Sequence, residues 1–258
     1  MLLEGKTAII YGAGGHIGAA VSRTFAREGA DLYLTGRNPD PLEAVKRDLV
    51  GVHDVDQVDA TDPTAVERHF ASVVDRAGHV DVSINLVGVE DVQGHELTAM
   101  ALADYLRPVE RAARTQFLTA TVAARHMTEQ ESGVILALTA TPVRLALPLV
   151  GGFGAACGAI EGMLRTLAAE VGPAGVRVCW LRSAGSPESF GPDVAVDTDG
   201  QPGGLADDEY LETLRRGTLL KRFPRLSEIA EAATFVASDR ASAMTGATAN
   251  ATCGQIVD

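Results

Sequence analysis

The segment Gly12–Gly18 (GAGGHIG) has the residue types that hold a phosphate group. It follows the apolar run Thr7–Tyr11 and precedes Ile17–Arg27, in which Val21 and Phe25 recur at helical spacing. Glycines let the backbone turn tightly and approach a pyrophosphate, and the helix N-terminus adds unpaired N–H groups and the positive end of its dipole. Because this strand–turn–helix context is the one that the chemistry requires, we predict a dinucleotide-binding loop formed by Gly12, Gly14, Gly15, His16, Ile17 and Gly18.

The elements that must position this loop alternate between strand-like and helix-like segments. Asp40 and Asp62 each precede a proline, as an N-cap residue precedes a proline at the first helical position. Further helices are predicted at Val66–Ala77, Ala112–Met127 and Gly151–Val171, and strands at Thr7–Tyr11, Asp31–Thr35, Val55–Val58, Val82–Val87, Val134–Leu138 and Val176–Leu181. Alternation of this kind implies βαβ units, so we predict an α/β fold of the Rossmann type, with a doubly wound parallel sheet in three α/β/α layers.

One stretch interrupts the alternation. Residues Ser183–Leu205 are rich in Gly, Pro, Asp and Ser and have little periodicity, whereas Asp207–Arg216 has a helical pattern. A long irregular stretch inside a compact domain is usually functional or disordered, so we predict a lid or substrate loop at about residues 183–217. No linker divides the chain, which predicts a single domain over residues 1–258.

Composition limits the partners and the cellular setting. The formal net charge of −12 disfavours nucleic acid and anionic membrane surfaces as partners. No apolar run reaches the length of a transmembrane helix, and the segment before the first strand is too short for a signal peptide and carries Glu4, so a cytoplasmic location is predicted. Cys157, Cys179 and Cys253 lack the spacing of a metal site, so no metal is expected, and we interpret them as buried thiols in a reducing compartment.

The glycine loop resembles the Thr-Gly-x-x-x-Gly-x-Gly pattern of the short-chain dehydrogenase/reductase family. Gly12 and Gly18 match this pattern, whereas Tyr11 stands in place of the threonine and His16 in place of the middle glycine. The resemblance implies that His16 projects at the pyrophosphate or the adenosine side of a bound cofactor. Two interpretations of His16 stay open, a phosphate ligand or a side chain that points into solvent.

The resemblance extends over nearly the whole chain. Asp59 matches the family's adenine-binding Asp, and Asn85 and Gly88 match the outer members of its Asn-Asn-Ala-Gly motif. Four further segments resemble the fifth strand, the sixth strand, the last helix and the lead into the final strand, in this order: Gly133–Leu138, Val176–Leu181, Phe235–Asp239 and Thr245–Gly246. Their order and spacing together identify the chain as a divergent member of the family.

The end of the second predicted strand bears on the choice of cofactor. An acidic residue at this place hydrogen-bonds the ribose 2′-hydroxyl in NAD enzymes. This chain has Thr35-Gly36-Arg37 instead, and the Arg37 guanidinium could bind a 2′-phosphate through two parallel hydrogen bonds. NADP(H) is therefore predicted in preference to NAD(H). The alternative is that Arg37 is an exposed arginine without a function.

The family reduces carbonyl groups with an Asn-Ser-Tyr-Lys tetrad, in which the Tyr donates the proton and the Lys depresses the Tyr pKa. A phenol with a pKa of about 10 needs such help to act at neutral pH. In this chain Phe153 stands at the Tyr position and Cys157 at the Lys position, while Ala140 and Ala112 replace the Ser and the Asn. The usual reaction by the usual mechanism is therefore not expected, although the binding scaffold is retained.

Other polar residues could take over part of the chemistry. Thr139 and Thr141 flank the Ser position and each offers a hydroxyl, and Cys157 could be a thiol with an unusual pKa. Further candidates are Glu188 in the predicted lid and three residues of the loop after Asn85, namely Glu90, Asp91 and His95. A lone His in a surface loop is more often solvated than catalytic. A positioned acid or base contributes about 10²–10⁴-fold to the rate, so the identity of that group decides whether the enzyme works well.

Three functions stay open. The first is an oxidoreductase with a substituted active site, which uses NADP(H) on a small carbonyl or alcohol substrate. The second is a non-redox enzyme on the same scaffold, such as an isomerase, lyase or cyclase, which exploits an apolar pocket lined by Leu147 and Phe153. The third is a catalytically inactive protein that binds NADP(H) and regulates a relative. Analogy at the level of the fold favours the first.

The resemblance also bears on assembly. The predicted helices Ala112–Met127 and Gly151–Val171 correspond to the pair through which members of the family usually dimerise. The second helix is dense in Gly and Ala, which lets two such helices approach closely. A homodimer or homotetramer is therefore expected.

Overall fold

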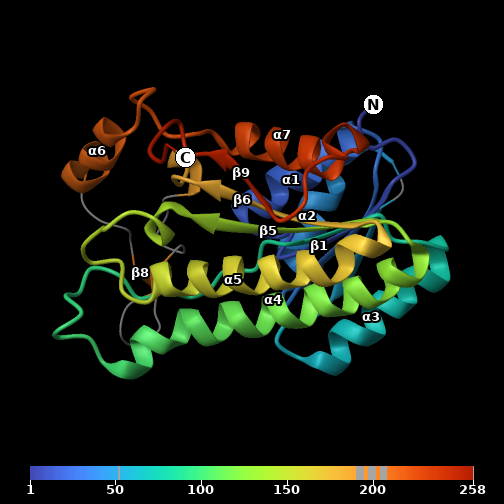
Figure 1. Ribbon diagram of the computed structural model, residues 1–258, viewed down its shortest axis with the longest axis horizontal. Coiled ribbons are helices and arrows are strands. Elements are labelled where there is room, and N and C mark those ends of the chain that lie inside the picture. Colours follow the sequence, from blue (N-terminus) through green and yellow to red (C-terminus); the bar gives the residue numbers. More distant parts are fainter. Residues whose placement is uncertain (52, 190–194, 197–201, 204–207, 258) are drawn as a thin grey trace.

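The computed structural model describes residues 1–51, 53–189, 195–196, 202–203 and 208–257. Its centre is a seven-stranded parallel sheet in the order β3-β2-β1-β4-β5-β6-β9 (Figure 1). The strands are β1 (Thr7–Tyr11), β2 (Asp31–Gly36), β3 (His53–Gln57), β4 (Val82–Asn85), β5 (Gly133–Ala140), β6 (Val176–Ser183) and β9 (Ala247–Ala251). The strand order turns back between β1 and β4, so the carboxyl ends of these two strands border the crevice where such sheets bind ligands.

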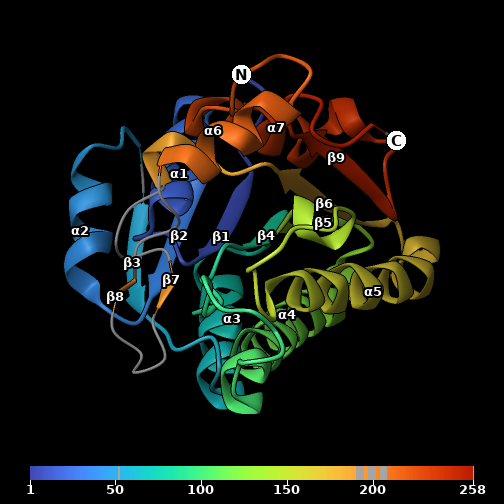
Figure 2. The same ribbon diagram turned by 90° about the vertical axis from the view of Figure 1, so that its left-hand side faces the viewer.

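Helices cover both faces of this sheet (Figure 2). They are α1 (His16–Arg27), α2 (Pro39–Arg47), α3 (Pro63–Ala77), α4 (Leu102–Gln130), α5 (Phe153–Val171) and α7 (Leu226–Ala237). Helices α3, α4 and α5 enclose one apolar core, which includes Phe70 and Leu164, and helices α1, α2 and α7 enclose the other, which includes Phe25 and Leu42. The predicted three-layer Rossmann fold in a single domain is thus confirmed.

Burial on both faces explains the apolar runs that predicted the strands. All five residues of β1 and all four of β4 are buried, as expected for central strands covered by helices on both sides. The sequence placed the end of β4 too late, at Val87. The strand stops at Asn85 because the Asn85 Oδ1 atom accepts a hydrogen bond from the Val87 N–H, at 2.9 Å, and turns the chain out of the sheet.

Two helix starts differ from their predictions, whereas a third agrees. Helix α2 begins at Pro39, because Asn38 rather than Asp40 is its N-cap and its Oδ1 atom accepts a hydrogen bond from the Asp40 N–H at 3.1 Å. Helix α4 begins at Leu102 rather than Ala112 and continues through Pro108. Asp62 caps α3 as predicted, accepting hydrogen bonds from two backbone N–H groups of the first turn.

Part of the predicted lid at about 183–217 lies outside the described residues, namely 190–194, 197–201 and 204–207. The described part contains a short 3₁₀ turn (Pro187–Ser189), the antiparallel pair β7 (Ala195–Val196) and β8 (Pro202–Gly203), and helix α6 (Asp208–Gly217). Helix α6 agrees with the helical pattern seen at Asp207–Arg216, although Asp207 itself is not described.

Two of the three cysteines are buried as predicted, but Cys253 is only partly buried, in a turn where its φ is +54°. Across the described ranges, no three His, Cys, Asp or Glu side chains come together as a metal site would require. None of the helices in the described part of the chain is both long enough and apolar enough to cross a bilayer.

A buried histidine lies under the sheet, between α3 and the strands. The His69 side chain packs edge-on against Tyr11, and its Nε2 atom lies 3.3 Å from a carboxylate oxygen of Asp56. Burial lowers the pKa of His69, and this effect outweighs the opposing attraction of Asp56, which Arg76 also holds at 3.0 Å. The folded protein therefore keeps His69 neutral at a pH where the unfolded chain binds a proton.

We expect acidification to destabilise the fold through His69. Because the folded pKa lies below the unfolded value of about 6.5, this contribution is present above pH 6.5 and is lost as the pH falls, by up to about 1.4 kcal/mol at pH 5.5. Urea unfolding of wild type and of the His69→Phe variant at pH 7.5 and 5.5 measures it. The variant should lose less stability than wild type between the two pH values, whereas His95→Gln, a change in an exposed loop, should match wild type. Equal losses in wild type and His69→Phe would show that His69 does not titrate in this way.

Candidate active site

The glycine loop lies against backbone on two sides. Gly12 has a φ of +78°, and a Cβ atom on it would lie 2.7 Å from the carbonyl carbon of Leu86, at the end of β4. A Cβ atom on Gly18 would lie 2.2 Å from the Gly12 carbonyl oxygen. The Gly12 N–H donates to the Thr35 carbonyl at 2.9 Å, which ties the loop to β2. Neither glycine position therefore has room for a side chain.

His16 is the first residue of α1 and has an exposed side chain. Its Nδ1 atom lies 2.9 Å from the Glu188 carbonyl oxygen. Because a carbonyl oxygen can only accept, Nδ1 carries the proton and donates it. The structure thus adds a third arrangement to the two interpretations of His16, phosphate ligand or solvated side chain. In this arrangement the His16 side chain connects the glycine loop to the turn after β6.

Two cavities open beside this loop. The loop cavity, of about 730 Å³, is lined by Gly12, Gly14, Gly15, Thr35, Gly36, Arg37, Asn38, Pro41, Leu42, Val58, Asp59, Ala60, Leu86, Val87, Gly88, Glu90, Arg107 and Arg111. The central cavity, of about 280 Å³, lies at the carboxyl ends of β4 and β5 against α4 and α5. The segment 86–88 lines both cavities, so a dinucleotide placed across the glycine loop would pass from one cavity into the other.

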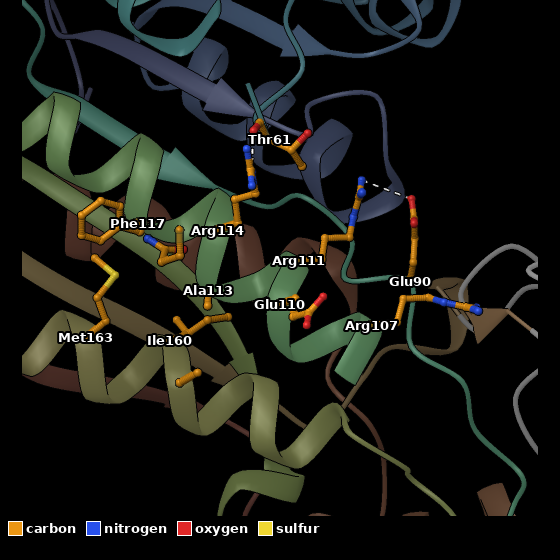
Figure 3. A pocket seen from close by; sticks show the side chains of 12 residues that line it. Thr61, Glu90, Arg107, Glu110, Arg111, Ala113, Arg114, Phe117, Ile160 and Met163 are labelled. Carbon is orange, nitrogen blue, oxygen red and sulfur yellow. Dashed lines mark hydrogen bonds and ion pairs between the residues drawn. The ribbon is translucent and has the colours of Figure 1, made fainter. Parts of the chain in front are cut away.

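The loop cavity contains a cluster of arginines around one glutamate. Arg37 and Arg111 both pair with the Glu90 carboxylate, at 2.9 and 3.1 Å, and the Arg111 Nε atom also donates to the Gly88 carbonyl at 2.8 Å. Figure 3 shows Arg111, Arg107 and Glu90 at this end of α4. Burial lowers the pKa of Arg111, opposed by the Glu90 charge. Glu90 itself has a φ of +57°, an uncommon conformation for a residue with a side chain.

Asp59 and Asn85, which match positions of the family's motifs, both form hydrogen bonds with threonines. The Asp59 Oδ1 atom accepts from the Thr61 N–H at 2.9 Å and from the Thr61 hydroxyl at 2.7 Å, and the backbone bond in particular lowers the pKa of Asp59. Asn85 is buried, and its Nδ2 donates to the Thr119 hydroxyl on α4 at 3.0 Å. Asp59 lines the loop cavity, and Asn85 and Gly88 line the central cavity.

The four positions that the family resemblance assigns to the tetrad converge on the central cavity. Ala112, Ala140, Phe153 and Cys157 all line it, together with Ile17 of the glycine loop. Burial raises the pKa of the Cys157 thiol to about 12. This thiol is therefore protonated at neutral pH and can act neither as a fixed cation nor as a thiolate nucleophile.

The two threonines beside Ala140 differ in their contacts. The Thr139 hydroxyl donates to the Glu161 carboxylate at 3.0 Å, and Glu161 in turn binds the Arg182 guanidinium at 2.8 Å. Because this hydrogen bond uses the single hydroxyl proton of Thr139, the Thr139 side chain is fixed in the wall of the cavity. Thr141 starts the short 3₁₀ turn after β5, is buried and also lines the cavity.

Two polar side chains of this cavity, Asp91 and Gln116, are buried. The sequence named Asp91 among the candidates of the loop after Asn85, but it gave no role to Gln116. Asp91 is 5% exposed, and burial raises the pKa of its carboxyl group, while Gln93 donates a hydrogen bond to it. Gln116 is 2% exposed, and among the described residues its Nε2 atom has no hydrogen-bond partner. Gln116 follows Ala112 by one helical turn, so the spacing of α4 places it on the same face as the family's Asn position.

His95 and Glu188, the remaining candidates from the sequence, are exposed, and neither lines the central cavity. Among the described residues that do line it, only Asp91 and Cys157 have titratable side chains. Together these features define an α/β dinucleotide-binding protein whose central cavity is largely apolar and holds one buried carboxyl group.

Comparisons with known proteins identify the family within this class. The family model described as enoyl-(acyl carrier protein) reductase matches residues 12–255. The chain is 27% identical to the D-beta-hydroxybutyrate dehydrogenase of Rhizobium meliloti (strain 1021) over 93% of this chain and 95% of the relative. It is 28% identical to the D-threitol dehydrogenase of Mycolicibacterium smegmatis over 95% of this chain and 90% of the relative. The chain belongs to the short-chain dehydrogenase/reductase family.

Solved structures agree with this assignment. A short-chain dehydrogenase/reductase family protein, 29% identical, superimposes with a TM-score of 0.80 over 98% of both chains. A short-chain dehydrogenase/reductase from Serratia marcescens BCRC 10948, 25% identical, superimposes with a TM-score of 0.82 over 99% of both chains. Members of this family bind a nicotinamide cofactor, and the coarser functional prediction is confirmed: the chain is an oxidoreductase of the short-chain dehydrogenase/reductase type.

We expect the Gly18→Ala variant to lose cofactor binding. The added methyl group would lie 2.2 Å from the Gly12 carbonyl oxygen, so the loop must move away from β4. The dissociation constant for NADPH, measured by nicotinamide fluorescence, should rise at least about 10-fold, because a shifted loop loses backbone hydrogen bonds to the pyrophosphate worth about 1.5 kcal/mol or more. Gly158→Ala is the matched control, since nothing lies within 4 Å of a Cβ atom on this α5 glycine. Unchanged NADPH binding by Gly18→Ala would contradict the assigned role of the loop.

Proposed function

We propose that the protein is an NADP(H)-dependent oxidoreductase that interconverts a small carbonyl compound and its alcohol through a non-standard active site. The observation that carries this proposal is the shared lining of the two cavities by the segment 86–88. The loop cavity would hold the adenosine of a cofactor whose pyrophosphate rested on the glycine loop, and the central cavity would hold its nicotinamide.

The residues present suit a dinucleotide. Gly12 and Gly18 let the loop pack tightly against Leu86 and against its own backbone, and the N-terminus of α1 offers N–H groups to a pyrophosphate. Asp59 remains ionised beside the adenosine, because hydrogen bonds from Thr61 lower its pKa. When bound, the cofactor supplies the hydride, while the chain positions the substrate and handles the proton.

The arginine cluster supports NADP(H) over NAD(H). Arg37, Arg107 and Arg111 all line the loop cavity, where the carboxylates of Asp59 and Glu90 also lie. A ribose 2′-phosphate would replace Glu90 as the anionic partner of Arg37 with the same charge-assisted geometry. The exposed Arg37 side chain, which pairs with Glu90, can turn toward such a group.

The cavity dimensions support a small substrate. At about 280 Å³ the central cavity is near the lower limit for small-molecule sites. Its walls are largely apolar, and Leu211 and Leu214 of α6 contribute to them, as do Ser183 and Ser189 after β6. These contacts support the prediction of a substrate loop at about 183–217. The cytoplasmic location remains a prediction.

Cofactor titrations test the proposal. We expect wild type to bind NADPH at least 10-fold more tightly than NADH, and Arg37→Gln to lose about 10- to 100-fold for NADPH with little change for NADH, since a hydrogen bond to a charged group contributes about 1.5–3 kcal/mol. Arg23→Gln, which removes an exposed ion pair with Asp48, is the control. Equal affinities for the two cofactors would contradict the NADP(H) assignment. A protein that binds neither cofactor would point instead to a non-redox enzyme on this scaffold.

We further propose that two chains associate through α4 and α5. Phe117 is 56% exposed on α4, and Figure 3 shows it beside Met163 of α5, with Ala113 and Ile160 nearby. An exposed aromatic side chain within an apolar surface of two long helices is typical of an oligomer interface. The family resemblance supports the same interface, because these two helices correspond to the pair through which members of the family usually dimerise.

Light scattering of the purified protein should therefore give at least twice the mass of one chain. The Phe117→Asp variant should give the mass of one chain, because a carboxylate in the interface is desolvated without a partner. Leu219→Asp is the control, since Leu219 is also exposed but lies after α6. A monomeric wild type would contradict this proposal.

A further inference from the structure

Carbonyl reduction requires a proton as well as a hydride, and the family's proton donor is replaced by Phe153. The replacement group must lie in the central cavity and must be able to give up a proton there. Thr139 has its proton engaged by Glu161, and the Cys157 thiol, with a pKa of about 12, holds its proton tightly. These two residues therefore make poor donors.

We propose that Asp91 is the proton donor of this active site in reduction and the proton acceptor in oxidation. This inference rests on the proposed oxidoreductase function. Asp91 lines the central cavity with the four tetrad positions and follows Gly88, the residue where the loop cavity meets the central cavity. Asp91 therefore lines the cavity that would take the substrate, three residues beyond the segment that both cavities share.

The surroundings of Asp91 disfavour its charged form. The carboxyl group is 5% exposed, and its hydrogen-bond partner Gln93 is uncharged. Burial raises the pKa of Asp91, and the hydrogen bonds from Gln93 and from its own backbone N–H offset only part of that rise. The other titratable side chain of the lining, Cys157, is near enough for the Asp91 charge to contribute to its raised pKa.

Charged groups behind the cavity wall do not supply a counter-ion. Glu161 and Arg182 lie beneath Thr139 and Cys157, and they pair with each other at 2.8 Å. Glu161 also binds the exposed Arg165, at 3.0 Å. Burial rather than a nearby charge is the main cause of the raised Asp91 pKa. A buried carboxyl group without a cationic partner stays protonated to higher pH than an exposed one.

The proposed step balances. The carbonyl carbon gains a hydride from the reduced nicotinamide, the electron pair of the C=O π bond moves to the oxygen, and the oxygen takes the proton from the Asp91 carboxyl group. The products are the alcohol, the oxidised cofactor and the Asp91 carboxylate, which regains a proton from solvent when the alcohol leaves. In oxidation the carboxylate takes the hydroxyl proton as the hydride departs.

The test compares wild type with Asp91→Asn and Asp91→Glu in the reduction of two small activated carbonyl compounds, 2,3-butanedione and ethyl pyruvate, with NADPH. Asparagine keeps an oxygen to accept the Gln93 hydrogen bond but cannot give up a proton to an alkoxide. We expect Asp91→Asn to lose about 10²–10⁴-fold in kcat with an unchanged dissociation constant for NADPH. Asp91→Glu should retain more activity than Asp91→Asn.

The pH profile separates catalysis from a structural role. Because the acid form is required, wild-type kcat/KM for reduction should fall as the pH rises through the raised pKa of Asp91, and this decline should be missing in Asp91→Asn. The Gln93→Leu variant removes a hydrogen bond that lowers the Asp91 pKa, so its decline should move to higher pH. A residue that only supports the fold would not produce these shifts.

The outcomes distinguish the two proposals. Reduction by wild type with equal reduction and an equal pH profile in Asp91→Asn would overturn the role of Asp91 and leave the oxidoreductase in place. Failure of wild type to bind NADPH or to reduce either compound would overturn the proposed function, and the role of Asp91 with it. Loss of NADPH binding in Asp91→Asn alone would overturn proton donation in favour of a role in holding the loop.

Discussion

The constraint on which the site depends is the backbone contact at the crevice between β1 and β4. Gly12 lies against the Leu86 carbonyl and Gly18 against the Gly12 carbonyl, with no room for a Cβ atom at either place. This contact sets the first turn of α1 above the strand ends and leaves a cavity on each side. The loop cavity and the central cavity share the segment 86–88 because the chain must leave β4 under the glycine loop. The site is thus a consequence of strand order and of two missing side chains.

Behind the central cavity, a buried ion pair takes up positions near those of the family's catalytic groups. Glu161 and Arg182 have side chains that are each 1% exposed, and Thr139 donates to the same carboxylate. In a buried pair the loss of hydration offsets most of the Coulombic attraction, so the pair is weak support for stability. Its clearer consequence is geometric. It holds α5 to β5 and β6 at the cavity wall, and Arg165 binds the same carboxylate from the exposed side of α5 at 3.0 Å.

The sequence was sufficient for the fold, because alternating strand and helix patterns and the glycine loop are local features that the parallel sheet must satisfy. The sequence predicted the starts of helices less well where two local patterns competed. The sequence placed the start of α4 at Ala112, yet this helix begins at Leu102 and continues through Pro108, and Asn38 rather than Asp40 caps α2. Asp91 and Gln116 show a different limit. Their types were visible in the sequence, but Asp91 lies in a loop without periodicity, and only the packing of that loop against the cavity makes its carboxyl group buried.

The changes at the tetrad follow one electrostatic logic if Asp91 transfers the proton. A phenol, with a pKa of about 10, needs a nearby cation that lowers its pKa, whereas a carboxylic acid, with a pKa of about 3.9, needs an apolar site that raises it. A lysine at position 157 would stabilise the Asp91 carboxylate and remove the acid at neutral pH. The uncharged side chains of Cys157 and Phe153 therefore suit a carboxyl group that donates a proton, just as a lysine suits a tyrosine that donates a proton. The proton donor and the cation cannot be exchanged separately, which explains why both positions of α5 differ from the family pattern in the same chain.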